Sequence, residues 1–174
     1  MRKKRLLQLT AALLCAVILS ACGGTPADAD YTCTVSISCA TILDNMDQCA
    51  ESKKELVPAD GVILPPTEVV FAEGESAFDV LQRVCRDNGI HLESKFTPVY
   101  NSAYIQGIHN IYEFDVGKLS GWMYAVNDWF PNYGCSLYQV QDGDVIRWVY
   151  TCDLGADVGG GQATGDGQQE GAST

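Results

Sequence analysis

The segment from residue 76 to residue 89 has the clearest helical pattern in the chain, and it limits the fold more than any other feature. Its apolar residues form one stripe at helical spacing: Ala77, Phe78, Val80, Leu81, Val84 and Cys85. Ser76 and Asp79 can cap the first turn, and Gly89 suits the position just after a helix end. The stripe therefore predicts one amphipathic helix that packs its apolar face against a core.

Strand patterns lie on both sides of this helix. Residues 32–39 alternate, with apolar side chains on one face and hydroxyl side chains on the other, and residues 68–71 form a shorter strand pattern. Residues 122–126 predict a strand that ends in a turn, and residues 145–151 form the strongest strand pattern, apolar on both faces apart from Arg147. The strand at 145–151 is therefore expected at the centre of a sheet.

The order of these elements predicts an α+β domain. The natural candidate is a β-grasp-like mixed sheet with one main packed helix, in which the first and last strands lie parallel at the centre. Residues 44–61 are polar and are expected to form a loop. The short apolar runs at 91–96, 103–108 and 111–114 leave strands and a helical turn open as alternatives.

The first 21 residues have the parts of a secretory signal peptide. A basic cluster at 2–5 precedes an apolar run from Leu6 to Leu19, which is shorter than the roughly 20 residues that a membrane-spanning helix needs. The run ends in Leu19-Ser20-Ala21-Cys22, which resembles the lipobox of bacterial lipoproteins. That resemblance implies lipid attachment at Cys22 and a protein tethered to the extracytoplasmic face of the bacterial cell membrane.

The remaining chain divides by composition. Residues 22–30 are expected to be the lipidated cysteine and a spacer, residues 31–156 one folded domain, and residues 157–174 a disordered tail of small and polar residues. Without the basic cluster at 2–5, seven basic residues face 22 acidic ones, a net charge of −15. A chain this acidic is not expected to bind nucleic acid through its phosphates.

Six cysteines remain after the signal and the lipidated residue are set aside, and an even number in an exported chain favours disulfides. In a β-grasp, Cys39 and Cys152 would both lie at the far ends of the parallel central strands. We therefore expect a disulfide between Cys39 and Cys152. The cysteines lack Cys-x-x-Cys spacing, so metal binding by these thiols is the weaker interpretation.

Motifs in the last third of the chain resemble a known family. They are Gly121-Trp122-Met123-Tyr124-Ala125-Val126-Asn127, Pro131-Asn132-Tyr133-Gly134 and Asp142-Gly143-Asp144-Val145-Ile146. The domain resembles the transcobalamin-like C-terminal domain, a bacterial family that is similar to the small β domain of vitamin B12 carriers. The resemblance covers roughly residues 32–156 and implies cobalamin or another corrinoid as a ligand. This sequence departs from the family at Asp128, where the turn usually has glycine. Vitamin B12 carriers hold their ligand between the small domain and a large helical domain, and we expect this chain to provide only the small domain's half of such a site.

Aromatic side chains are dense in the same third. Those on the strands, such as Trp122 and Trp148, are predicted to be core. Rings in a loop are harder to bury, so the loop rings and nearby amides are the predicted ligand-binding residues: Asn127, Trp129, Phe130, Asn132 and Tyr133. Rings with an amide suit a flat amphipathic ligand such as a corrinoid, and they also suit a sugar or a peptide.

Catalysis has little support in the sequence. The two histidines, His91 and His109, have no partners at catalytic or metal-binding spacing. We therefore expect no enzyme, no bound metal and no cofactor, apart from a corrinoid as ligand. Two hypotheses remain. One is a membrane-anchored extracytoplasmic lipoprotein that binds a small molecule, with corrinoid uptake as the candidate role. The other is a cell-surface module that docks a protein or glycan without any small-molecule ligand.

Overall fold

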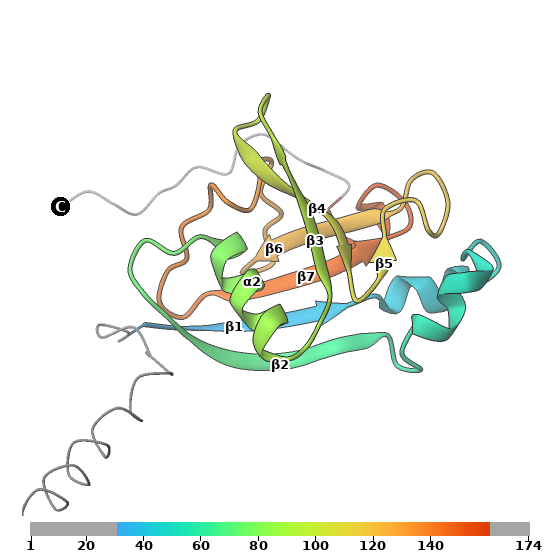
Figure 1. Ribbon diagram of the computed structural model, residues 1–174, viewed down its shortest axis with the longest axis horizontal. Helices are drawn as coiled ribbons and strands as arrows, with labels where there is room; N and C mark the ends of the chain where they lie inside the picture. Colours follow the sequence, from blue (N-terminus) through green and yellow to red (C-terminus); the bar gives the residue numbers. More distant parts are fainter. Residues whose placement is uncertain (1–30, 161–174) are drawn as a thin grey trace, which may run out of the picture.

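The computed structural model describes residues 31–160, and Figure 1 shows their arrangement. The fold is α+β, with two sheets and one main helix. The predicted signal peptide, Cys22 and the spacer lie outside the described residues, as does the tail from residue 161 onward. Among residues 31–160, no helix is both long and apolar enough to span a membrane.

The larger sheet has four strands in the order β2-β1-β7-β6. These are β1 (Tyr31–Ser38), β2 (Val62–Phe71), β6 (Gly121–Val126) and β7 (Val145–Thr151). The first and last strands, β1 and β7, pair in parallel at the centre, and β2 and β6 add antiparallel edges. This arrangement confirms the predicted central pair and the β-grasp-like sheet.

The edge strand β2 is longer than the sequence predicted. It begins at Val62 and passes through Pro65 and Pro66, two residues that cannot donate a backbone hydrogen bond and are tolerated at a sheet edge. Two short 3-10 helices precede it: η2 (Ala40–Asn45), which ends at the start of the expected loop 44–61, and η3 (Glu51–Leu56), which lies within that loop.

The main helix, α2 (Ala77–Asp87), begins and ends as the pattern predicted. Its capping box is complete: the Asp79 N–H donates to Ser76 Oγ at 3.2 Å, and Asp79 Oδ2 accepts from the Ser76 N–H at 2.9 Å. The apolar stripe is buried apart from Phe78, which is half-buried, and Figure 1 shows α2 lying across one face of the larger sheet. Arg83 ties the helix to the edge strand, because it bonds Glu75 at 2.6 Å and donates to the carbonyl of Val70 at 2.9 Å.

The segments that the sequence left open form a second sheet. It contains β3 (Leu92–Thr97), β4 (Ser102–Ile108) and β5 (Ile111–Tyr112), in that order. β3 and β4 form an antiparallel hairpin whose tip projects from the body of the molecule in Figure 1. The four central residues of β3 are exposed, so this strand lacks the alternation by which a half-buried strand is recognised in a sequence.

Aromatic rings of β6 and β7 form part of the core and connect the two sheets. Trp122 packs edge-on against Tyr150 at 5.3 Å between ring centroids, and Tyr124 stacks on Trp148 at 5.5 Å. The Trp122 indole donates to the carbonyl of Ile111 at 2.8 Å. These rings are buried, which confirms the prediction that the strand aromatics are core.

The six cysteines of the described residues are all free thiols. The predicted disulfide between Cys39 and Cys152 is therefore not formed in this structure. The parallel register pairs Ser38 with Val149, so Cys152 lies further along β7 than the level of Cys39. The Cys152 thiol instead contacts the hydroxyl of Thr41 at 3.8 Å. Burial raises the pKa of Cys39 to about 12, which keeps that thiol protonated.

The folded part continues past residue 156, where the sequence placed the start of a disordered tail. The 3-10 helix η4 (Ala156–Val158) follows β7. The Asp157 carboxylate accepts from the N–H of Cys152 at 2.7 Å and also from the hydroxyl of Thr151. Residues up to 160 therefore belong to the described structure.

A tyrosine-lined groove as the candidate functional site

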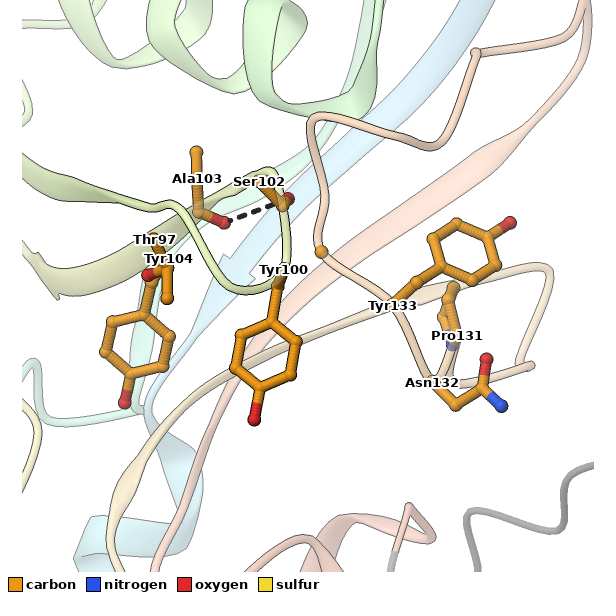
Figure 2. A pocket seen from close by; sticks show the side chains of 9 residues that line it. Thr97, Tyr100, Ser102, Ala103, Tyr104, Pro131, Asn132 and Tyr133 are labelled. Atoms are coloured by element: carbon orange, nitrogen blue, oxygen red, sulfur yellow. Dashed lines mark hydrogen bonds between the residues drawn. The ribbon is translucent and has the colours of Figure 1, made fainter.

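A groove of about 530 Å³ lies between the tip of the β3–β4 hairpin and the loop that follows β6. Figure 2 shows the hairpin residues on one side and the loop residues on the other. The lining residues are Thr97, Tyr100, Ser102, Ala103, Tyr104, Pro131, Asn132, Tyr133 and Gly134. Three of the nine are tyrosines, and none carries a charge.

The hairpin wall is built around a turn. Asn101 has φ of 47°, a left-handed conformation that asparagine tolerates, and the Tyr100 N–H donates to the carbonyl of Thr97 at 3.1 Å. This turn leaves the Tyr100 side chain 72% exposed. Tyr104 is 44% exposed, and its hydroxyl donates to Glu113 at 2.5 Å. Burial, and then this carboxylate, raise the pKa of Tyr104 to about 12, so the phenol stays neutral.

The opposite wall is the loop segment 131–134, which side chains behind it hold in place. The hydroxyl of Tyr124 on β6 donates to the carbonyl of Tyr133 at 3.0 Å. Trp129 meets the Tyr133 ring edge-on at 6.0 Å between centroids and 63° between planes. Burial raises the pKa of Tyr133 as well. The loop wall is therefore anchored to the sheet at its backbone and supported by a second ring.

The floor of the groove joins the two walls. Ser102 is 2% exposed, and its Oγ lies 2.9 Å from Ser136 Oγ. Ser136 Oγ also accepts from the Ala103 N–H at 3.0 Å. Gly134 packs directly on this contact, because a Cβ added there would lie 1.8 Å from Ser102 Oγ. A side chain at position 134 would push the loop away from the hairpin.

Two of the five predicted ligand-binding residues, Asn132 and Tyr133, line this groove. Trp129 is 37% exposed and stands behind Tyr133 as its support. Phe130 lies elsewhere, against Gly160, where an added Cβ would meet its ring at 2.9 Å.

The side chain of Asn127 forms hydrogen bonds within the turn that joins β6 to the loop. Its Nδ2 donates to Asp144 at 2.8 Å, and its Oδ1 accepts from the Val145 N–H at 2.9 Å. Asn127 and Asp128 have φ of 50° and 67°, as a type I′ turn requires. The turn therefore forms with aspartate in the place where the resemblance expects glycine.

The hairpin wall, which contributes Tyr100, Ser102 and Tyr104, was not predicted from the sequence. A signal for it existed, because Pro98 and Asn101 are turn residues between two short apolar runs. The runs were too irregular to show that they pair, so the two tyrosines could not be placed opposite Tyr133.

The arrangement suits non-covalent binding of a small molecule. Its volume falls within the range of about 300–1,000 Å³ that is typical of ligand pockets. Ring faces supply apolar contact, while Asn132 and the hydroxyls of Ser102 and Thr97 supply neutral hydrogen-bonding groups. Among residues 31–160, no group of three or more histidine, cysteine, aspartate or glutamate side chains is placed to hold a metal ion.

The chain was compared with known families and with solved structures. Residues 74–152 match a family described as a domain of unknown function, DUF4430. Haptocorrin in complex with Cbi aligns with a TM-score of 0.51 at 13% identity, over 78% of this chain and 28% of the haptocorrin chain. The likeness supports a transcobalamin-like fold for the domain, while this chain spans little more than a quarter of haptocorrin.

A second solved structure is a protein from Ruminococcus gnavus ATCC 29149 that is provisionally described as metal-binding. It has a TM-score of 0.42 and 15% identity, over 70% of this chain and 97% of that one. A score this low carries no argument about function. The search of curated proteins found no match.

Proposed function

We propose that this chain is an extracytoplasmic lipoprotein, anchored through Cys22, whose groove binds a flat amphipathic small molecule, with a corrinoid as the first candidate. The observation that carries this proposal is the tyrosine-lined groove of about 530 Å³ between the hairpin and segment 131–134. The alternative is a surface module that docks a protein or glycan. The exposure of Val99 and Tyr100 at the hairpin tip favours that alternative.

The form of the groove supports a flat ligand. Tyr100 comes from the hairpin wall and Tyr133 from the loop wall (Figure 2), and aromatic side chains bring large contact area at small entropic cost. The floor is held by the Ser102–Ser136 contact, and Tyr124 and Trp129 support the loop wall. Much of the site is therefore formed before a ligand arrives, which lowers the cost of binding.

The corrinoid candidate rests on two supports. The motifs of residues 121–146 resemble the small domain of vitamin B12 carriers, and the fold is similar to haptocorrin, which was crystallised with Cbi. Uptake is proposed because a tethered binding protein outside the membrane can hold a scarce nutrient near a transporter.

Binding is tested on residues 23–174, which contain every described residue. We expect saturable binding of dicyanocobinamide or cyanocobalamin by calorimetry and visible absorbance, weakened by Tyr100→Ala and by Tyr133→Ala. Phe114→Ala is the matched control, because Phe114 is an exposed aromatic outside the lining. An absence of heat and of spectral change with both corrinoids would refute corrinoid binding and favour the docking module.

Anchoring is tested separately. Wild-type chain expressed in a bacterial host should fractionate with membranes and carry the added mass of acyl chains on Cys22. Cys22→Ala should abolish both. A wild-type chain found without acylation would refute the lipoprotein assignment while leaving the binding proposal intact.

A further inference from the structure

The groove is lined without any charged side chain, although the chain as a whole is strongly acidic. The sequence has 22 acidic and 11 basic residues, yet the groove presents only aromatic rings, hydroxyls, one amide, small apolar side chains and backbone. The carboxylate in contact with the lining is Glu113, which accepts from the Tyr104 hydroxyl. Lys95 pairs opposite Tyr104 in the β3–β4 ladder, but its side chain is exposed and does not line the groove.

The floor and the lip offer neutral hydrogen-bonding groups. Ser102 is nine-tenths buried or more, and its Oγ is 2.9 Å from Ser136 Oγ. The Ser102 hydroxyl also donates to the carbonyl of Ala103 at 3.4 Å. A serine hydroxyl has two acceptor sites besides its one donor, so with Ser136 donating to Ser102 one acceptor site remains for an N–H or O–H group of a ligand. Asn132 at the lip is exposed and adds an amide donor and acceptor.

These observations indicate which chemical groups on the edge of a ligand the groove can accept. A buried carboxylate or phosphate needs a cation or several donors to offset its lost hydration, and the lining supplies no cation. The acidic surface would add repulsion. A neutral amide edge, in contrast, can exchange its water for Ser102 and Asn132 at little cost.

We propose that the groove selects an uncharged flat ligand that carries amide or hydroxyl groups on its edge, received by Ser102 at the floor and Asn132 at the lip. The inference deepens the proposed function and rests on it. Anionic ligands of the same shape are rejected because the lining has no group to neutralise them.

The test uses two corrinoids that share one ring. Dicyanocobinamide carries neutral amides on its edge, and dicyanocobyrinic acid carries carboxylates there. Calorimetry on residues 23–174 should give a dissociation constant for the amide form at least about tenfold lower than for the acid, since each tenfold corresponds to about 1.4 kcal/mol. Ser102→Ala should weaken binding of the amide form by about tenfold through loss of its hydroxyl.

A variant that binds the acid more tightly can distinguish selection by charge from damage to the fold, because a damaged fold would bind both corrinoids more weakly. Asn132→Arg places a cation in the lining and should tighten binding of the acid by about tenfold, narrowing the ratio between the two corrinoids. Phe114→Arg adds the same charge outside the groove and should leave that ratio close to the wild-type value.

The outcomes are distinct. Equal affinity of wild-type chain for the two corrinoids would overturn the selection by charge while leaving the groove as a corrinoid site. An equal effect of Asn132→Arg and Phe114→Arg would overturn the assignment of selection to this lining. Binding of neither corrinoid would overturn the proposed corrinoid function and this inference with it.

Discussion

Gly134→Ala tests the close approach of the loop to the hairpin. The added Cβ would lie 1.8 Å from Ser102 Oγ and 2.4 Å from Ser102 Cβ, and 3.3 Å from the carbonyl oxygen of Ala103. Gly134 does not have a positive φ, so the expected cost is steric alone. Overpacking of this kind costs about 1–3 kcal/mol, which corresponds to a fall in Tm of about 4 °C for each kcal/mol in a domain of this size.

The assay is urea unfolding followed by tryptophan fluorescence, with Gly121→Ala as the matched control. A Cβ at Gly121 would meet Glu113 Cβ at 3.7 Å, an ordinary contact, so that variant should stay within about 0.5 kcal/mol of wild type.

Double variants show whether Ser102 is the clashing group. In the Gly134→Ala background, Ser102→Gly removes both close atoms and should recover at least about 1 kcal/mol relative to the sum of the single changes. Ser102→Ala should recover less, because its Cβ remains at 2.4 Å. If Gly134→Ala is as stable as Gly121→Ala, the floor of the groove is not assembled as described.

Three further predictions concern the turn and the thiols. Asn127→Ala should lower the free energy of unfolding by about 1–2 kcal/mol, because the amide holds both Asp144 and Val145; unchanged urea stability would contradict this role. The free energy of unfolding should fall as pH rises from about 9 to about 12. Burial raises the pKa of the Cys85 and Cys135 thiols from 9.0 to about 12, so only the unfolded chain releases these protons in that range. A free energy of unfolding that stays constant over this range would contradict the burial of the two thiols. A thiol reagent should react with six cysteines in unfolded residues 23–174 before any reductant is added, whereas reaction with only four would indicate a disulfide.

Regular periodicity explains which elements could be predicted from the sequence. The stripe of α2 and the alternation of β1 each follow the repeat of their own element, and β7 has the apolar run of a strand buried on both faces. Those signals are local, so they are visible in one sequence. The β3–β4 hairpin lacks such a signal, because β3 is exposed along most of its length and its pairing depends on the rest of the fold.

Part of the loop wall of the candidate site could be predicted from the sequence, because its signal is also local. Tyr133 and Asn132 could be found because aromatic rings in a loop stand out against a polar background. Tyr100 and Tyr104 come from the unrecognised hairpin, and Ser102 is the kind of small residue that no pattern singles out. The Cys39–Cys152 disulfide was expected from strand order, which does not determine how far one parallel strand is shifted along the other, and the structure has both thiols free.

Hydrogen–deuterium exchange of residues 23–174, with and without saturating dicyanocobinamide, tests whether the groove is the ligand site. We expect slower exchange with the corrinoid bound in two separate segments, 97–104 and 131–134, which form the two walls of the groove. Segments remote from the groove, such as η2 and η3, should exchange at the same rate in both states. Protection confined to those remote segments, or no protection with the corrinoid bound, would contradict the assignment of the groove as the ligand site.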